Sequence, residues 1–169
     1  MGTVDHVVFI AGGHLAIHPI AEVGFQFIEK AGMVRFFAPL LVAKYATRPL
    51  TPGPASSITL TTGSVSERPE AGWAVVNSLA TGVHGMARGL ALDLAPIRVN
   101  AVSPGGAATP LWDSMSKEQR KKLQERLGKG TCTGMIGGVE DVAEAYLLLT
   151  KGHNVTGSVI STDGGALLK

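Results

Sequence analysis

The sequence predicts an α/β fold in which helices cover both faces of a doubly wound parallel sheet of about four strands. Short β-branched runs that end at glycine or proline alternate with longer segments in which apolar residues recur every three to four positions. This alternation is typical of βαβ units, which place their strands parallel. The composition agrees, because 45% of the residues are hydrophobic, only 5% are aromatic and 22 are glycine. We therefore expect one domain, residues 1–169, without repeats.

Four segments have the pattern of strands. They are residues 6–11, 57–62, 98–102 and 157–162. The first is a continuous apolar run closed by Gly12 and Gly13, which is typical of a buried parallel strand. The other three are closed by Gly63, by Pro104 and by a turn that contains Gly164.

Four further segments have helical spacing. They are residues 21–46, 73–94, 116–127 and 140–150. In the first, Gly32 and Pro39 weaken the expectation of one continuous helix. The second keeps its apolar residues on one face throughout. The third is charged, and Ser116 with Gln119 forms a capping box at its start.

Charge and cysteine content exclude several functions. A formal net charge of +2 is too small to indicate a nucleic-acid partner. The single cysteine, Cys132, excludes an internal disulfide and a thiolate metal site, which fits a reduced, cytoplasmic setting.

The first residues carry no basic segment before their apolar run, so we expect no signal peptide. No apolar run approaches the roughly 20 residues of a membrane span.

Several motifs resemble the short-chain dehydrogenase/reductase family in order and spacing. The strongest is the run from Arg88 to Gly105, which resembles the junction between a helix and the family's sixth strand almost residue for residue. Pro104-Gly105 followed by Thr109 fits Pro-Gly-x-x-x-Thr, and an Asp-Gly-Gly ending at Gly165 is also typical. The resemblance covers nearly the whole chain. It implies a truncated Rossmann-like sheet built of the family's strands 4-5-6-7.

The catalytic Tyr-x-x-x-Lys of that family is absent. The chain has two tyrosines, and Tyr45 and Tyr146 are followed four residues later by Pro49 and Thr150. The family's hydride chemistry depends on a tyrosine whose pKa is lowered by the lysine. The resemblance places the tyrosine position near Val76 and the lysine position near Ala80, or, in a shifted register, at Leu79 or Trp73. None of these residues can replace a phenol and an ammonium group, so we do not expect an ordinary dehydrogenase.

The dinucleotide fingerprint is absent as well. The resemblance implies that the family's first three strands and their glycine-rich turn lie upstream of the strand that begins here just after Met1. The glycines of 128–134 have a similar form but follow a charged helix instead of a strand, so we interpret them as a loop. We therefore expect no useful NAD(P) binding and no other cofactor or metal.

Candidate site residues lie where the strands end, because the crevice of a doubly wound sheet is at the carboxyl ends of its strands. For catalysis the candidates are His14, His18, Thr62 and Ser64. For substrate binding they are Arg35, Trp73, Asn77, Thr109 and Trp112. Each of these residues also has an ordinary structural interpretation. The histidines can be solvated loop residues, and the hydroxyl groups can form hydrogen bonds within turns. Arg35 can extend toward solvent or pair with Glu29 or another acid. The resemblance places Arg35 near the family's helix asparagine and Thr62 or Gly63 at its serine.

Together, these expectations predict a non-redox enzyme that binds a hydrophobic small molecule and catalyses a cyclisation, isomerisation or dehydration. The resemblance suggests a role in microbial, often fungal, secondary metabolism. We expect a homodimer, formed either through the apolar edge of the first strand or through the long helices. Two alternatives remain: a non-catalytic binding or assembly subunit, and a residual NADP-dependent reductase, against which the absent Tyr-x-x-x-Lys counts heavily. The substrate, the reaction and its stereochemistry do not follow from the sequence.

Overall fold

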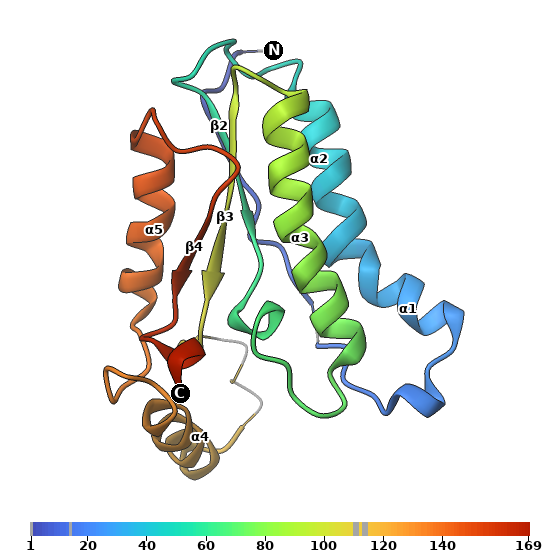
Figure 1. Ribbon diagram of the computed structural model, residues 1–169, viewed down its shortest axis with the longest axis vertical. Coiled ribbons are helices and arrows are strands. Elements are labelled where there is room, and N and C mark those ends of the chain that lie inside the picture. Colours follow the sequence, from blue (N-terminus) through green and yellow to red (C-terminus); the bar gives the residue numbers. More distant parts are fainter. Residues whose placement is uncertain (1, 14, 110–111, 113–114) are drawn as a thin grey trace.

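The computed structural model describes residues 2–13, 15–109, 112 and 115–169 and contains one four-stranded sheet (Figure 1). The strands are β1 (His6–Val8), β2 (Ser57–Thr61), β3 (Arg98–Pro104) and β4 (Val159–Thr162). Their order is β1-β2-β3-β4 and every pair is parallel. The register sets Val7 beside Ile58, and Val102 beside Ile160. The expected α/β class, the parallel sheet and the strand count are confirmed.

Helices cover both faces of the sheet. The helices are α1 (Phe25–Gly32), α2 (Ala38–Ala46), α3 (Ala74–Asp93), α4 (Lys117–Lys129) and α5 (Val139–Lys151). Figure 1 shows α2 and α3 side by side on one face and α5 on the other, with α4 beyond the end at which the strands point. Short 3₁₀ turns add η1 (Ile20–Glu22), η3 (Ser64–Ser66) and η5 (Ala166–Leu168). No described helix is long and apolar enough to cross a membrane.

The core lies mainly between the central strands and the α2–α3 layer. Its fully buried members include Ala43, Ile58, Leu60, Ala87 and Val99. A smaller cluster of Val102, Ala145 and Leu149 joins α5 to the opposite face. Because β2 and β3 are covered on both faces, nearly all of their residues are buried.

A buried arginine secures α5 to the sheet. Arg98, only 3% exposed, donates to the carbonyl oxygens of Leu149 and Thr150 in the last turn of α5, at 2.7 and 3.1 Å, and to that of Pro54 at 2.6 Å. A cation at a helix C-terminus satisfies carbonyls that lack a partner within the helix. Burial lowers the pKa of the Arg98 guanidinium, which nevertheless stays charged.

The segment expected to be helical over 21–46 is helical from Phe25 to Ala46, and its irregular turn lies between Gly32 and Pro39, the two residues that weakened the expectation of one regular helix. The segment folds as η1, then α1, then a π-helical turn, η2 (Met33–Phe37), and then α2. The N–H of Ala38 reaches back to the carbonyl of Met33, five residues earlier. The next residue, Pro39, has no N–H to continue an ordinary helical pattern, which explains a widened turn here.

The first strand also differs from expectation. Residues 6–11 were expected to form a buried strand, but β1 has three residues, two of them exposed. The reason is its position, because β1 ends the sheet and pairs only with β2. Val8 and Ile10 are 42% and 67% exposed. An apolar run predicts a strand but does not show whether a neighbour covers it.

Candidate functional site

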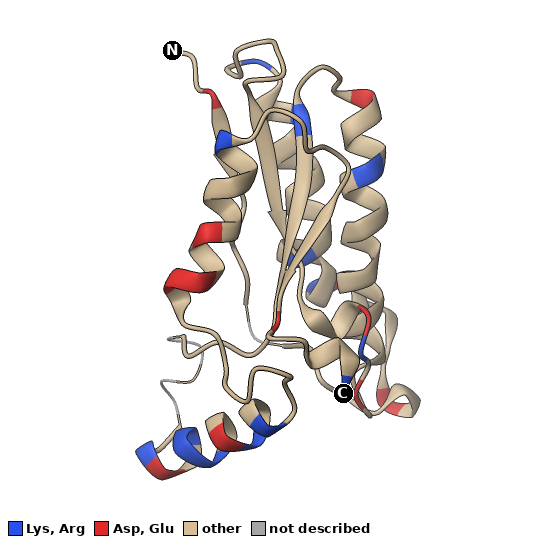
Figure 2. Ribbon diagram, turned by 60° about the vertical axis from the view of Figure 1, so that its left-hand side comes forward, with Lys and Arg blue, Asp and Glu red and all other residues tan. Residues whose placement is uncertain are grey.

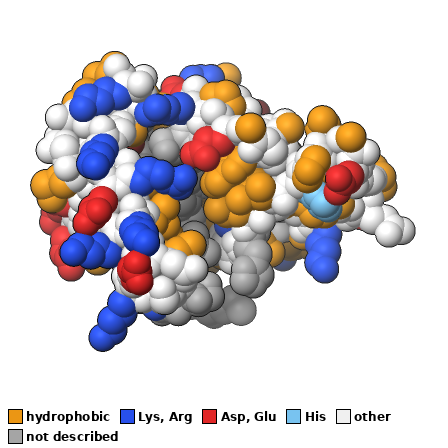
Figure 3. All heavy atoms as spheres, turned by 90° about the horizontal axis from the view of Figure 1, so that it is seen from below, with side chains coloured by type: hydrophobic (Ala, Val, Ile, Leu, Met, Phe, Trp, Pro, Cys, Tyr) orange, Lys and Arg blue, Asp and Glu red, His pale blue; other side chains and the backbone are white. Residues whose placement is uncertain are grey.

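The candidate site lies at the carboxyl ends of the strands, the end seen in Figure 3. The segment that follows β1 crosses to the start of α3, where the backbone N–H of His18 donates to the carbonyl of Gly72 at 3.1 Å. The segment after β2 turns through η3 and is fastened to the same helix. Figure 3 shows Lys and Arg side chains gathered on one side of this end and hydrophobic side chains next to them. The candidate site is therefore bordered by the segments that follow β1 and β2 and by the start of α3.

Arg35 is the principal charged group of the site. It lies in the widened turn η2, and its side chain reaches back to donate from Nη2 to the carbonyl of Gly13, just after β1. Its Nε is buried without a hydrogen-bond partner among the described residues. Burial lowers the pKa of the Arg35 guanidinium, but arginine remains charged at any physiological pH. The site thus holds a cationic group with an unused buried donor, which favours an oxygen acceptor.

The turn after β1 lies directly beside this arginine. A Cβ added at Gly12 would lie 3.4 Å from Nη2 and 3.6 Å from Cζ of Arg35, which is ordinary van der Waals contact. Arg35 was considered as a partner of Glu29 or another acid, but in the structure its hydrogen-bond partner is the Gly13 carbonyl, a neutral acceptor. A neutral partner leaves the positive charge uncompensated in a half-buried place. Widened π-helical turns are frequent at functional sites.

The beginning of α3 contributes Trp73 and Asn77. Trp73 is half-buried at the N-cap; its N–H donates to Glu70 and its carbonyl accepts from the N–H of Asn77 at 2.7 Å. The side-chain amide of Asn77 donates to the carbonyl of Val65 in η3. Val76, in contrast, is 4% exposed and belongs to the interior. Of these residues, Trp73 is the one that leaves an aromatic surface partly accessible where the strands end.

The candidate hydroxyl groups have mostly structural partners. Thr62 Oγ1 donates to the carbonyl of Ala80 in α3 at 2.8 Å, which is the turn role weighed against catalysis. Ser64 begins η3 and is half-buried; its carbonyl accepts from Glu67 and Arg68. The only hydroxyl hydrogen of Thr62 is therefore donated within the protein, so Thr62 can only accept a hydrogen bond from a substrate.

His18 has an acidic and an aromatic neighbour. Its Nδ1 lies 3.5 Å from a carboxylate oxygen of Glu22, and its ring meets that of Phe27 edge-on with centroids 5.4 Å apart. These contacts orient the imidazole toward η1 and α1. His14 lies outside the described residues.

Thr109 and Trp112 follow β3 at the other side of the site. The N–H of Trp112 donates to the carbonyl of Thr109 at 3.1 Å, so the two residues share a turn. Both side chains are half-buried. Among the described residues, hydrogen bonds join the candidates near β1 and β2 to α3, and none joins Thr109 or Trp112 to Arg35 or Trp73.

Sequence reasoning missed a hydrogen-bonded chain beneath the site. Thr61 Oγ1 donates to the carbonyl of Phe9 at 2.7 Å and lies 2.8 Å from the hydroxyl of Tyr146 in α5. Because the only hydroxyl hydrogen of Thr61 goes to Phe9, Tyr146 must donate to Thr61. Desolvation raises the pKa of Tyr146, and the bond to Thr61 opposes this in part. The partners are 85 residues apart, and no local pattern indicates such a contact.

The glycine-rich segment 128–134 leaves the end of α4 as a loop, as the sequence predicts. The cluster Gly128–Gly134 closes on itself, because a Cβ at Gly128 would lie 3.1 Å from the carbonyl oxygen of Gly134. Its glycines thus permit backbone packing after α4 and do not open toward a phosphate at a strand-to-helix turn. Near β3, a Cβ at Gly105 would lie 2.8 Å from Cα of Asp163, so that turn is also filled. The described chain likewise offers no group of three or more His, Cys, Asp or Glu suited to a metal.

Known proteins share both the sequence and this geometry. The family model described as an SDR-like Rossmann domain matches residues 2–169. A short-chain dehydrogenase/reductase of Gibberella fujikuroi, fsr5, is 46% identical over 169 residues, 99% of this chain and 63% of that protein. The corresponding protein malC of Malbranchea aurantiaca is 40% identical over 98% of this chain and 63% of its own length.

Solved structures agree. MalC of Malbranchea aurantiaca, described as a reductase/Diels-Alderase, superposes with a TM-score of 0.94 over 99% of this chain and 64% of its own. A small-chain dehydrogenase in complex with NADPH, 33% identical, gives 0.92 over 99% of this chain and 76% of its own. The chain thus spans a little under two thirds of the length of fsr5 and MalC. With the four parallel strands and the 88–105 motif, these matches show that the chain belongs to the short-chain dehydrogenase/reductase family.

Proposed function

We propose that this protein is a redox-neutral member of its family that binds a hydrophobic small molecule and promotes its cyclisation, with isomerisation or dehydration as related outcomes. The observation that carries the proposal is Arg35, a half-buried cation with an unused donor, in a site whose chain has no Tyr-x-x-x-Lys. Supporting it, MalC is described as a reductase/Diels-Alderase. The fungal relatives support a role in secondary metabolism.

The chemistry follows from what such a donor can do. A substrate carbonyl that accepts a hydrogen bond from Arg35 loses electron density from its oxygen and from any conjugated double bond. That polarisation lowers the barrier to carbon–carbon bond formation at the double bond, and a cycloaddition then forms two σ-bonds from two π-bonds without net gain or loss of a proton or an electron. A charged donor acts more strongly on a bound substrate where that substrate displaces water from it than it would in bulk water.

Binding and orientation would contribute the remaining acceleration. Trp73 and Trp112 offer half-buried aromatic surfaces to a hydrophobic substrate, and Asn77 and Thr109 border them. When the protein holds two reacting segments of one substrate molecule in contact, less conformational entropy is lost on reaching the transition state. His18 is held by Glu22 and could move a proton where the reaction is an isomerisation or dehydration.

The mass of the product tests this proposal, because it distinguishes cyclisation or isomerisation from dehydration and from reduction. An extract of the producing organism lacking this gene would be incubated with the purified protein, with and without NADPH, and followed by high-resolution mass spectrometry. A cyclisation or isomerisation yields a product of unchanged mass, and a dehydration yields one lighter by a water. We expect such a product in the absence of NADPH. It should be lost in Arg35→Gln but not in Arg48→Gln, at an exposed position in the turn after α2.

Two results would contradict the proposal. A product heavier by two hydrogens that forms only with NADPH would indicate a reductase. No conversion by the folded protein under either condition would favour the alternative of a binding or assembly subunit, for which the exposed apolar edge of the sheet is the supporting observation.

A further inference from the structure

Two hydrogen bonds in series join α5 to the segment that leads into the candidate site. Tyr146 donates to Thr61 Oγ1 at 2.8 Å, and Thr61 donates to the carbonyl of Phe9 at 2.7 Å. Figure 2 shows α5 and α3 on opposite faces of the sheet, so this chain starts on the face away from α3. Bonds in series strengthen one another, because a hydroxyl that accepts a hydrogen bond becomes a better donor.

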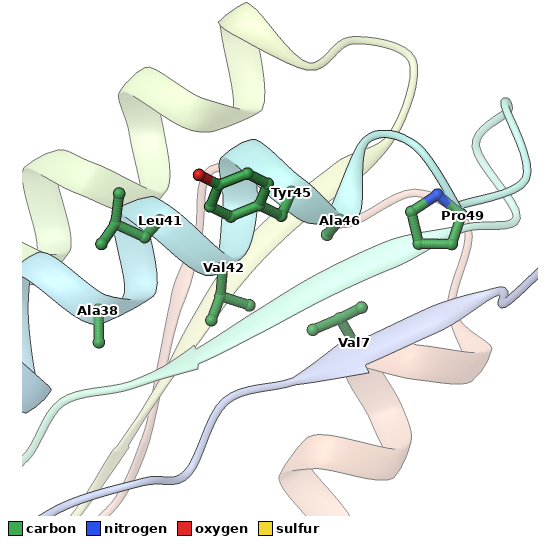
Figure 4. A pocket seen from close by; sticks show the side chains of 7 residues that line it. All are labelled: Val7, Ala38, Leu41, Val42, Tyr45, Ala46 and Pro49. Atoms are coloured by element: carbon green, nitrogen blue, oxygen red, sulfur yellow. The ribbon is translucent and has the colours of Figure 1, made fainter.

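Packing fixes both ends of this chain. The ring of Tyr146 packs against the smaller core cluster, which includes Leu149. At the other end, the side chain of Phe9 packs on the main core. Figure 4 shows Val7, two residues earlier along β1, pointing toward α2 on that same side of the sheet. The two hydrogen bonds therefore connect one core cluster to the other across the end of β1.

The carbonyl of Phe9 marks the point at which the chain leaves the sheet. The N–H of Phe9 donates to the carbonyl of Thr59 at 2.8 Å, and a regular parallel ladder would continue with a bond from the N–H of Thr61 to the carbonyl of Phe9. Among the described residues, the Thr61 side chain makes that bond instead. The next described hydrogen bond along the segment is at Gly13, whose carbonyl accepts from Nη2 of Arg35. The Thr61 hydroxyl is thus the last attachment of this segment to the sheet before the segment reaches the arginine.

We propose that Thr61 and Tyr146 are positioning residues, which fix the segment after β1 and thereby hold the Arg35 guanidinium in place. The inference rests on the proposed function, in which Arg35 donates to the substrate. A Cβ at Gly12 would lie 3.4 Å from Nη2, so the backbone of this segment lies against the guanidinium, and a shift of one moves the other. A misplacement of about 1 Å can lower the rate of a reaction by about 100-fold.

Hydrogen exchange at Nε of Arg35 tests the positioning without a substrate. This nitrogen is buried, and its signal in a proton–nitrogen NMR spectrum is identified by its loss in Arg35→Lys. Thr61→Val keeps the branched shape of the side chain but removes the hydroxyl, so we expect exchange of the Arg35 Nε–H to become about tenfold faster, as for the loss of one hydrogen bond. Thr61→Ser keeps a hydroxyl and should exchange like the natural protein. Tyr146→Phe leaves the bond to Phe9 without its second donor and should lie between the two.

Thr131→Val is the matched control. It also removes a buried threonine hydroxyl that donates to a backbone carbonyl, that of Gly128 at 2.8 Å, but it lies in the loop after α4. If Thr61 only stabilised the fold, general destabilisation would raise exchange at Arg35 equally in the control. Three results would overturn the proposal: unchanged exchange in Thr61→Val, an equal rise in Thr131→Val, or exchange at Arg35 of the natural protein as fast as at the exposed Arg48.

The mass-spectrometric assay separates this inference from the proposed function. We expect Thr61→Val to lower kcat about tenfold while KM changes less than about threefold, and Thr61→Ser to retain activity, because the hydroxyl positions a group that acts in the transition state. Faster exchange at Arg35 in Thr61→Val, combined with conversion that persists in Arg35→Gln, would support the positioning and refute the proposed function. Conversion that is lost in Arg35→Gln but unaffected by Thr61→Val would overturn the inference and leave the proposed function in place.

Discussion

Replacing Gly82 with alanine is expected to strain the contact that holds the arginine-bearing turn against α3. A Cβ at Gly82 would lie 2.6 Å from Cε2 of Phe36, which directly follows Arg35. Carbon atoms in contact normally lie about 3.5–4.0 Å apart, so the ring must move by about 1 Å. Phe36 packs on the core and meets Phe37 edge-on at 5.7 Å, which limits that movement. Overpacking of this kind costs about 1–3 kcal/mol.

The same helix supplies the control. Gly85 and Gly89 lie in α3, and an added Cβ at either would meet nothing within 4 Å. Alanine there gains about 1 kcal/mol of helix propensity without a clash, and Gly82→Ala gains the same but also pays for overpacking. We therefore expect Gly82→Ala to be about 2 kcal/mol less stable than Gly85→Ala, or roughly 4–8 °C in Tm. Urea and thermal unfolding measure this, and equal stability of the two variants would refute the reasoning.

Three further predictions concern the supports of the fold. Arg98→Met leaves the carbonyls at the end of α5 without their buried donor, so we expect it to lower the free energy of unfolding in urea by about 3 kcal/mol. Arg88→Met, at an exposed position of α3, is the control and should change that free energy by less than about 0.5 kcal/mol. Ser116→Ala removes the side-chain cap that accepts from the N–H of Gln119 and should cost about 1 kcal/mol by the same measurement; no loss would show that the cap is not used in solution. Tyr146→Phe should be about 1 kcal/mol less stable near neutral pH, because the hydroxyl bond is lost. Since the folded pKa of Tyr146 is raised above its ordinary 10.0, the unfolded chain ionises first, and the natural protein should lose this advantage as pH rises from 10 toward the folded value. A difference between the two proteins that does not change with pH would contradict this assignment.

Regular elements with strong local patterns could be predicted from the sequence. The helix expected over 73–94 is α3, which spans Ala74–Asp93, because its apolar residues keep one face throughout. The capping box of Ser116 and Gln119 is present in both directions, at 2.9 and 3.2 Å. Both depend on residues close in sequence, and local physical chemistry is enough to fix them.

Features that depend on distant partners could not be predicted. The strand over 6–11 is three residues long, and β2 is its one neighbour among the described strands. Arg35 was identified as a candidate, but its actual partner, the carbonyl of Gly13, is 22 residues away and carries no side-chain signal. The bond between Thr61 and Tyr146 joins a strand to a helix on the opposite side of the sheet from α3. Each of these requires knowledge of how the layers pack.

The reaction proposed for this protein transfers no hydride, and a deuterium-transfer experiment tests that proposal directly. Once the mass-spectrometric assay identifies a converted compound, the reaction would be repeated with NADPH carrying deuterium at C4, separately in each of its two stereochemical positions. We predict that the product contains no deuterium in either case and forms at the same rate when NADPH is omitted. Deuterium in the product, with conversion that stops without NADPH, would show hydride transfer and contradict the account.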